Sequence, residues 1–415
     1  MKQKLILIGS GMVGARFIER LLIEAPNKYD IHVFNKEPLG GYNRIMLSPV
    51  LAGEKSLPDI MTHDVNWFKA RGVTLHTGTT VTGVDTRLQT VQTEFGDAYP
   101  YDQLVIATGS KPFVIPVAGN DLPGVVTFRD TRDVDLMLGA AKQPLSRNHA
   151  ETRSEHAKPK AVVIGGGLLG LEAANGLKIQ GMDVTVVHRS SVLMNVQMDD
   201  ISGDLLKTSL QAQGLKFVMN ANTLAIQGEH SVTGVTLDTG ETLPADLVVM
   251  AVGIRPNVSV GQKMGLEVNR GIVVNDQLQT SDESIYALGE CVEHRGATYG
   301  LVAPLYEQAQ VLAEVLAGKS SDYQGSLTST MLKVTGIQLF SAGDFKDSAD
   351  AESIAYQDLA QNVYRKVVLK DNKIIGSVMF GDTSGAKWIF EQLISGKDMG
   401  ACRDFLVFGE GFCQA

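Results

Sequence analysis

KLILIGSGMVG at residues 4–14 and KAVVIGGGLLG at residues 160–170 share one pattern. In each stretch an apolar run of strand length is followed by Gly-x-Gly-x-x-Gly and then by a helix-like segment. The first glycine permits a tight turn, the second lets the backbone approach a pyrophosphate, and the third lets helix and strand pack closely. Because a helix N-terminus attracts phosphate, both stretches predict dinucleotide binding. The predicted contacts are Gly9, Gly11, Met12 and Gly14 in the first, and Gly165, Gly167, Leu168 and Gly170 in the second.

A second pair of landmarks repeats at a similar offset. LVIATG at residues 104–109 and LVVMAVG at residues 247–253 are apolar strands that end in glycine. Their closing glycines are 144 residues apart, and the two glycine-rich turns are 156 residues apart. Short apolar strands that alternate with helices form doubly wound parallel sheets. We therefore predict two copies of one βαβ-based domain.

The end of the chain follows another pattern. Apolar-rich runs flank Gly336 and the pair Asp371 and Asn372, and that pair is a plausible hairpin turn because both residues tolerate positive φ. A helix is expected at residues 383–395, with apolar residues on one face and Gly396 as its stop. These features predict a small antiparallel α+β domain. Its strands are expected at residues 330–334, 337–341, 363–369 and 374–380.

Composition limits the class of protein. The chain has 415 residues, of which 44% are hydrophobic and 20% are charged, as in a globular protein of two or three domains. A net charge of −9 argues against a nucleic-acid binder. No apolar run approaches the roughly 18 to 20 residues of a membrane span. Gly9 and Gly11 interrupt the first apolar run too early for a signal peptide, so we expect a buried first strand in a cytoplasmic protein.

The second strand of the first copy, at residues 31–34, should end near an acidic residue that binds ribose. Asn35 and Lys36 occupy its tip and Glu37 follows, so Glu37 is our first choice, Asn35 is the fallback, and a solvated loop carboxylate is the alternative. Arg44, in YNRIMLSP at residues 42–49, is a planar donor for a pyrophosphate or else a surface arginine. Ser48 is a candidate helix cap and is also placed among the expected FAD contacts.

In the second copy the corresponding strand, at residues 184–187, ends at His188, Arg189 and Ser190, with no acidic residue. Arg189, helped by His188 and Ser190, is a candidate for a 2′-phosphate, which favours NADPH or dual use; a solvated arginine is the alternative. Glu172 is expected either near the nicotinamide amide or on a helix surface. Residues 143–159 are polar and lack apolar periodicity, which predicts a mobile surface loop.

With SIYALGEC at residues 284–291, these motifs resemble those of the two-dinucleotide-binding flavoproteins, the FAD/NAD(P)-dependent pyridine nucleotide oxidoreductases, over roughly residues 1–320. The resemblance implies a glutathione-reductase-like α/β fold. Its expected parts are an FAD-binding domain (1–118 and 259–322), an NAD(P)-binding domain (119–258) and a C-terminal domain (323–415). It also implies that Gly289 and Glu290 close the FAD site, with Glu for the usual Asp. The helix after Pro304 would point its N-terminus at the flavin. Further FAD contacts are expected at Val81, Ala107, Thr108 and Gly109, and an NAD(P)H contact at Gly253.

Within this family the YNRxxLS motif, the GEC sequence and the C-terminal tail are similar to three groups. These are the flavoprotein part of NAD(P)H nitrite reductase large subunits, the electron-transfer subunits of assimilatory nitrate reductases, and the rubredoxin reductases. The resemblance implies a hydride path from NADH or NADPH through FAD to a separate redox protein, either a nitrate or nitrite reductase component or a small iron–sulfur protein. The flavin is the reacting centre, so no catalytic side chain and no metal is predicted. The sequence leaves a homodimer open.

The three cysteines, Cys291, Cys402 and Cys413, exclude several activities. Disulfide reductases need two cysteines beside the flavin, and the single-cysteine types need one, but residues 44–50 contain none. Three thiols allow at most one disulfide and no four-cysteine cluster, so we expect nitrite reduction itself to occur on another protein. Cys291 is best explained as a small buried residue. The alternatives are a rubredoxin or ferredoxin reductase, an NAD(P)H oxidase and a flavin-based redox sensor.

Overall fold

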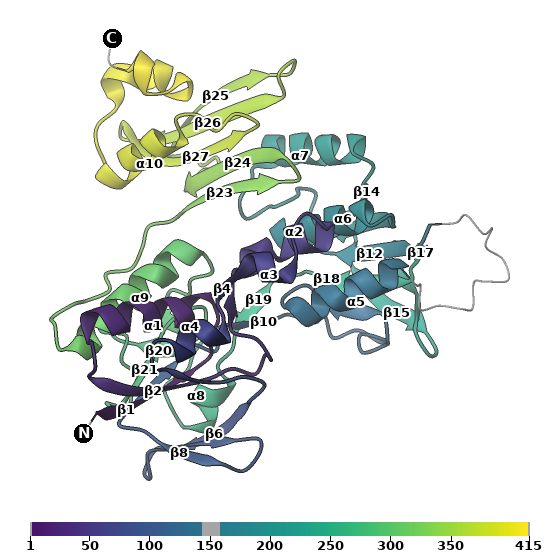
Figure 1. The fold of residues 1–415 in the computed structure, drawn as a ribbon. Helices are drawn as coiled ribbons and strands as arrows, with labels where there is room; N and C mark the ends of the chain where they lie inside the picture. The colour runs from purple at the N-terminus through teal and green to yellow at the C-terminus, as the bar shows by residue number, and fades with distance from the viewer. Residues whose placement is uncertain (1, 143–157, 414–415) are drawn as a thin grey trace. The chain divides into compact units, whose positions relative to one another are not determined.

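The computed structural model describes residues 2–142 and 158–413, so most of the loop predicted at 143–159 lies outside the described residues (Figure 1). Contacts divide the chain into two compact units. Unit 1 comprises residues 1–47, 55–111 and 254–326, and unit 2 comprises residues 48–54, 112–253 and 327–415. The predicted boundaries of the three domains stay a prediction.

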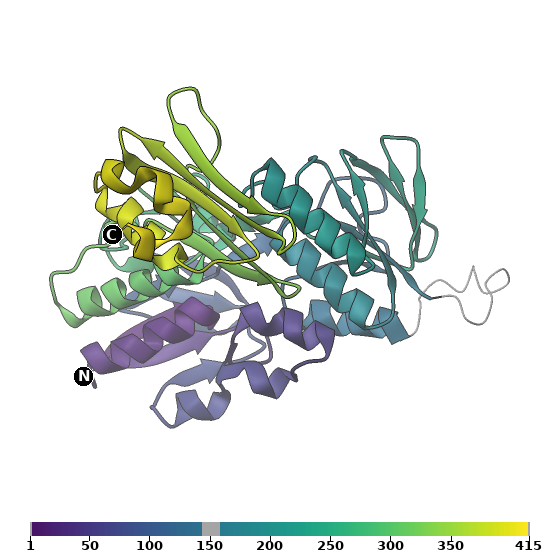
Figure 2. The ribbon, with the colours of Figure 1, turned by 90° about the horizontal axis from the view of Figure 1, so that it is seen from above.

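Unit 1 is built on a parallel five-stranded sheet with the order β21-β9-β1-β2-β5. The strand β1 (Gln3–Ile8) lies at its centre, and Leu5 and Leu7 are fully buried because a parallel sheet is covered on both faces. Helices α1 (Met12–Glu24) and α9 (Val302–Ala317) lie side by side in both views (Figures 1 and 2). The other strands are β2 (Tyr29–Phe34), β5 (Thr74–His76), β9 (Gln103–Ile106) and β21 (Ile285–Ala287).

Smaller elements complete unit 1. An antiparallel three-stranded sheet follows the first part of the parallel sheet: β6 (Val81–Asp85), β7 (Thr90–Thr93) and β8 (Ala98–Pro100). Two-stranded sheets pair β3 (Gly41–Tyr42) with β4 (Met61–His63), β20 (Ile272–Val274) with β22 (Val292–His294), and β10 (Ser110–Pro112) with β19 (Ile254–Pro256). The short helices are η1 (Arg44–Met46), α3 (Leu57–Ile60), α4 (Val65–Lys69) and α8 (Ser259–Lys263).

Unit 2 repeats this plan, which confirms the two predicted copies of a doubly wound sheet. Its parallel sheet has the order β11-β18-β12-β13-β14, and an antiparallel three-stranded sheet again accompanies it. The parallel strands are β11 (Val125–Thr127), β12 (Lys160–Ile164), β13 (Asp183–His188), β14 (Lys216–Met219) and β18 (Leu247–Met250). The antiparallel strands are β15 (Thr223–Gly228), β16 (Val232–Leu237) and β17 (Thr242–Pro244). The helices are α5 (Thr131–Lys142), α6 (Leu168–Ile179) and α7 (Asp200–Ala212).

One helix of unit 2 comes from an earlier part of the chain. Helix α2 (Leu47–Ala52) packs on α6, and its Leu51 is fully buried. A Cβ on Gly176 would lie 2.7 Å from Leu51 Cγ, so the glycine leaves the space that the leucine fills. Gln180 donates a hydrogen bond to the Leu51 carbonyl at 2.9 Å. Residues 48–54 are therefore an integral part of unit 2.

The C-terminal part of unit 2 is an antiparallel sheet with the order β23-β24-β27-β26-β25. Asp371 and Asn372 have φ of 49° and 58°, which confirms the predicted turn. The strand β25 was not predicted, because its exposed residues carry no apolar alternation. The bounds are β23 (Ser329–Val334), β24 (Ile337–Gly343), β25 (Glu352–Asp358), β26 (Val363–Lys370) and β27 (Lys373–Phe380).

The expected helix of this part, α10 (Ala386–Ser395), starts three residues later than predicted, because a turn closed by the Thr383 carbonyl precedes it. It ends at Gly396 (φ 60°), as expected. Two 3₁₀ segments follow, η3 (Gly400–Phe408) and η4 (Glu410–Phe412), and a disulfide between Cys402 and Cys413 joins them. None of the helices in the described ranges is long and apolar enough to cross a membrane.

Candidate cofactor sites

The first glycine-rich turn separates packing glycines from an open one. Gly9 has φ of 106°, and a Cβ there would lie 2.3 Å from the Ala107 carbonyl oxygen. A Cβ on Gly14 would lie 2.1 Å from the Gly9 carbonyl oxygen, whereas a Cβ on Gly11 would meet nothing within 4 Å. Gly11 is also the N-cap of α1 and provides no side-chain cap. The amides that start at Met12 therefore face an open cradle of the kind that binds a pyrophosphate.

The second turn has the same geometry. Gly165 has φ of 118°, and its Cβ would lie 2.3 Å from the Ala251 carbonyl oxygen. The Cβ of Gly170 would lie 1.9 Å from the Gly165 carbonyl oxygen, and Gly167, the N-cap of α6, is open on its Cβ side. In both copies the outer glycines allow the helix and the strand to pack closely. The middle glycine leaves room for a pyrophosphate to approach the protein backbone.

The end of β2 brings Glu37 and Arg44 together. Glu37 accepts hydrogen bonds from the Tyr42 hydroxyl at 2.9 Å and from Arg44 Nη2 at 3.0 Å. The Glu37 side chain is only 14% exposed, so it is not a solvated loop carboxylate. The fallback, Asn35, donates its amide to the Leu39 carbonyl at 2.7 Å and thereby shapes the loop. Glu37 and Arg44 lie at the carboxyl end of a parallel strand, where ligands of such sheets bind.

The turn after β21 closes this region. The backbone N–H of Gly289 donates to Oε1 of the fully buried Gln308 on α9 at 2.8 Å. A Cβ on Gly289 would lie 2.7 Å from Val13 of α1, so a glycine is needed there. Glu290 accepts from Ser110 Oγ at 2.7 Å, and Thr108 Oγ1 donates to the Asn257 carbonyl at 2.8 Å.

Two further residues of unit 1 that were predicted to contact FAD, Val81 and Pro304, are buried in the protein. Val81 is 8% exposed and belongs to the core of the unit. Pro304 is buried in the first turn of α9, whose N-cap, Leu301, provides no side-chain hydrogen bond. Gln308, which accepts the hydrogen bond from Gly289, was not predicted. A single glutamine inside an apolar helix does not indicate in the sequence which residue it will contact.

Ser48 departs from its predicted role. It lies inside α2 rather than before a helix, and the cap of the preceding η1 is Asn43, whose side chain accepts from the Ile45 N–H at 3.2 Å. The Ser48 hydroxyl instead donates to Glu172 Oε2 at 2.5 Å within unit 2. The prediction of Ser48 as a helix cap was wrong, because α2 already begins at Leu47 and not at Pro49.

Glu172 is a shielded carboxyl on α6. Burial raises the pKa of Glu172 above its ordinary value of 4.5, and the Ser48 hydrogen bond partly opposes that rise. A carboxyl on an open helix surface would not be shielded in this way. Glu172 is therefore shielded from water by the protein itself, and its place near a nicotinamide stays a prediction.

The shielding of Glu172 predicts a pH-dependent stability. The folded protein retains a proton on Glu172 between the ordinary and the raised pKa, so this group's contribution is complete below pH 4.5 and is lost as the pH rises through the raised value. Glu172→Gln should therefore raise the Tm relative to the unmodified protein at pH 7, and the difference should shrink toward pH 4. Thermal unfolding across this range measures it. The exposed Glu229→Gln is the control, and a constant difference for Glu172→Gln would contradict the prediction.

His188 and Arg189 differ in accessibility. His188 is 8% exposed; its Nδ1 accepts from the Gly166 N–H at 3.1 Å and its Nε2 lies 3.0 Å from the Val192 carbonyl oxygen. Burial lowers the pKa of His188, so the ring is neutral and both nitrogens serve the protein. A neutral ring with both nitrogens already hydrogen-bonded is not suited to bind the 2′-phosphate, as we had expected of His188. Arg189 is exposed and remains the candidate.

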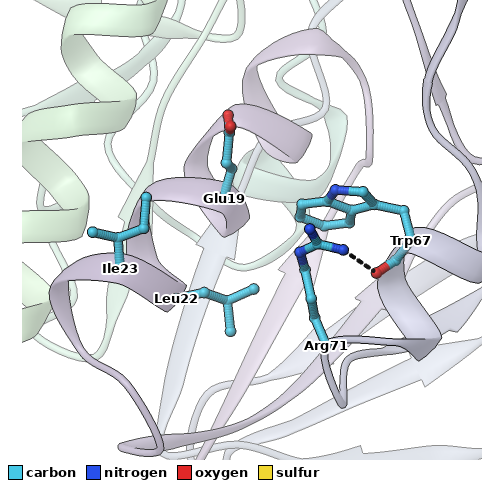
Figure 3. Close-up of a pocket in the computed structure, with 5 residues that line it drawn as sticks. All are labelled: Glu19, Leu22, Ile23, Trp67 and Arg71. Atoms are coloured by element: carbon cyan, nitrogen blue, oxygen red, sulfur yellow. Dashed lines mark hydrogen bonds between the residues drawn. The ribbon is translucent and has the colours of Figure 1, made fainter.

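A separate pocket of about 340 Å³ lies in unit 1, between α1 and α4, toward the end of α1 that is remote from the glycine-rich turn (Figure 3). Glu19, Leu22 and Ile23 line one side. On the other side the Arg71 guanidinium lies 4.2 Å from the centre of the Trp67 ring and donates to the Trp67 carbonyl at 3.2 Å. The pocket contains none of the predicted cofactor residues.

Two doubly wound parallel sheets, each followed by an open glycine-rich turn, are typical of oxidoreductases that bind two dinucleotides. Residues 3–312 match the family model of the pyridine nucleotide-disulphide oxidoreductases, and residues 329–397 match the rubredoxin NAD+ reductase C-terminal domain. The chain belongs to the pyridine nucleotide-disulphide oxidoreductase family. It is therefore an oxidoreductase, and the cofactors of its family are FAD and NAD(P)H.

Two similar proteins of Bacillus subtilis are named for nitrite and nitrate reduction. The chain is 47% identical over 393 residues to the nitrite reductase [NAD(P)H] of Bacillus subtilis, which covers 94% of this chain and 47% of that protein. It is 41% identical over 407 residues to the assimilatory nitrate reductase electron transfer subunit of the same organism, with 98% and 51% covered. The chain thus spans about half the length of these relatives. The NADH:rubredoxin oxidoreductase of Clostridium acetobutylicum has the same fold, with a TM-score of 0.80, 24% identity and coverage of 98% and 99%.

Proposed function

We propose that this chain is an FAD-dependent NAD(P)H oxidoreductase that passes electrons to a separate redox protein in nitrate or nitrite assimilation, in the cytoplasm. The names of its two Bacillus subtilis relatives support this proposal. When bound, FAD accepts a hydride from NAD(P)H and releases electrons to an acceptor. The protein's own part is to bind, orient and shield the two cofactors.

The placement of the cysteines carries the proposal. Residues 44–50 contain no cysteine, although the thiol-dependent members of such families need one beside the flavin. Cys291 is fully buried, its sulfur faces the Ile106 and Leu288 carbonyls, and burial raises the pKa of its thiol. Cys402 and Cys413 are joined to each other. A thiol path beside the flavin is therefore missing from the described residues, which favours an external acceptor.

The residue roles follow from the two cradles. We assign FAD to unit 1, with its pyrophosphate at Gly9, Gly11, Met12 and Gly14, and with Glu37 and Arg44 beyond β2. Glu290 and the N-terminus of α9 would serve the ribityl chain and the flavin ring. We assign NAD(P)H to unit 2, with its pyrophosphate at Gly165, Gly167, Leu168 and Gly170. Arg189 would bind a 2′-phosphate, and Glu172 would face the nicotinamide end. His188 holds the second turn in shape.

A second candidate acceptor is a rubredoxin-like small iron protein. The match of residues 329–397 to the rubredoxin NAD+ reductase C-terminal domain favours it. The chain is also 31% identical to the nitric oxide reductase FlRd-NAD(+) reductase of Vibrio vulnificus, over 83% of this chain and 86% of that protein. The hydride chemistry is the same in both candidates, and only the docking partner differs.

An anaerobic experiment in two steps tests the proposal. The yellow protein, mixed with NADH or NADPH, should lose its oxidised flavin absorbance. Ferricyanide or a ferredoxin-like protein should then restore it, since no small organic substrate is required. Comparison of a nitrate reductase component with rubredoxin as the acceptor separates the two candidates. NAD(P)H oxidation that strictly requires an organic substrate would overturn the proposal. Sustained rapid oxygen uptake would indicate an oxidase, and no bleaching would indicate a sensor.

A further inference from the structure

The carboxylate of Asp199 is shared between two parts of unit 2. Its Oδ1 accepts from the N–H and the hydroxyl of Ser202, at 3.0 and 2.6 Å, and so caps the start of α7. Its Oδ2 accepts from the Tyr364 hydroxyl on β26 at 2.8 Å. Lys366 Nζ lies 3.7 Å from the same oxygen. In both views α7 lies beside the C-terminal sheet (Figures 1 and 2).

The two partners on β26 are buried and fixed. Tyr364 is 1% exposed and Lys366 is 4% exposed. Lys366 is also paired with Asp347 at 2.8 Å, so its charge is satisfied on both sides. Burial and the neighbouring Asp199 raise the pKa of Tyr364, so its hydroxyl stays a donor. A buried charged group with satisfied partners holds a single geometry, because any departure leaves it unpaired.

A short path of backbone contacts leads from Asp199 to the second glycine-rich turn. The N–H of Met198 donates to the Met194 carbonyl at 2.9 Å, and the N–H of Met194 donates to the Gly166 carbonyl at 2.9 Å. Met194 has φ of 50°, an uncommon conformation for a residue other than glycine. The segment 189–198 is therefore fastened to the turn near its middle and to the C-terminal sheet through Asp199 at its end. The exposed Arg189 stands at its beginning.

We infer that Tyr364 and Lys366 are positioning residues for the coenzyme site: they fix Asp199, and through it the segment that carries Arg189. The inference rests on the proposed function, which assigns NAD(P)H to this turn. A segment with a loose end must be ordered when the ligand binds, and that ordering lowers affinity. Since Arg189 is the candidate contact to a 2′-phosphate, loosening the segment weakens NADPH more than NADH.

Tyr364→Phe tests the inference, because it removes one hydroxyl and keeps the ring in the core. Direct equilibrium titration of the full chain with NADP+ and with NAD+ gives both dissociation constants without any electron acceptor. We expect the NADP+ constant to rise about tenfold, equal to about 1.4 kcal/mol, and the NAD+ constant to rise less than about threefold. Lys366→Met should act in the same direction. The rate of flavin reduction at saturating coenzyme should stay unchanged.

Two controls separate positioning from general docking of the sheet. Ser209→Ala removes the hydroxyl of α7 that accepts, at 3.0 Å, from the side chain of Asn362, the residue just before β26. This change leaves the hydrogen bonds of Asp199 in place. Tyr356→Phe makes the matched change on the neighbouring strand β25. Neither control should change the ratio of the two constants. Equal weakening of both nucleotides by Tyr364→Phe, or the same ratio change in Ser209→Ala, would overturn the inference alone. Failure of the unmodified chain to bind either nucleotide would overturn the proposed function as well.

Discussion

Gly14→Ala should yield protein that purifies almost without flavin. The added methyl carbon would lie 2.1 Å from the Gly9 carbonyl oxygen, which is backbone and cannot rotate away. Helix α1 would have to retreat from the turn, and the amides that begin at Met12 would move with it. Because those amides and the helix dipole supply the predicted pyrophosphate contacts, we expect the affinity for FAD to fall at least about a hundredfold, or about 2.7 kcal/mol.

The ratio of flavin to protein absorbance after purification measures this loss, and titration of the apoprotein with FAD measures the affinity. Gly83→Ala on β6 is the matched control, because its new methyl would make only an ordinary contact with Gln92 at 3.5 Å. The control should keep its flavin. Gly14→Ala protein with full flavin content would show that the first turn does not hold FAD.

Gly170→Ala should give the opposite phenotype, a yellow protein that NADH and NADPH no longer reduce. Its methyl carbon would lie 1.9 Å from the Gly165 carbonyl oxygen, so α6 must move away from the second turn. The flavin contacts of unit 1 are unaffected by this change. We expect kcat/KM for NAD(P)H to fall at least about a hundredfold, or about 2.7 kcal/mol of transition-state stabilisation.

Dithionite separates the two steps, since it reduces flavin without a coenzyme site and should still bleach Gly170→Ala. The matched control is Gly139→Ala on α5, where a methyl group would meet nothing within 4 Å. Anaerobic stopped-flow reduction by NADH and NADPH provides the measurement. Normal reduction of Gly170→Ala by either coenzyme would contradict the assignment of NAD(P)H to unit 2.

The sequence predicted what local chemistry determines. The two glycine-rich turns were predictable because only glycine tolerates the φ and the close carbonyls found at Gly9 and Gly165. The hairpin at Asp371 and Asn372 was predictable for a related reason, since both residues adopt positive φ. The buried position of Cys291 also agrees with its prediction. In each case the residue type is selected by the backbone it occupies.

Contacts between distant segments could not be predicted in this way. Ser48 and Glu172 are far apart in the chain, and neither carries a signal that names the other. The same is true of Asp199 and Tyr364, which meet only because the C-terminal sheet packs beside α7. His188 was assigned to a phosphate from its place after a strand. Its ring instead supports Gly166, and only the folded backbone reveals that contact.

Helix α2 limits which segments of this chain can be exchanged with those of a relative. A chimaera could take residues 112–253 from one relative and the remainder from another. Leu51 and Gly176, which are in contact here, would then come from different proteins. The recipient helix would then meet a surface shaped for a different side chain, or an unfilled apolar hole. Exchange of coenzyme preference between relatives should therefore transfer residues 48–54 together with the middle segment.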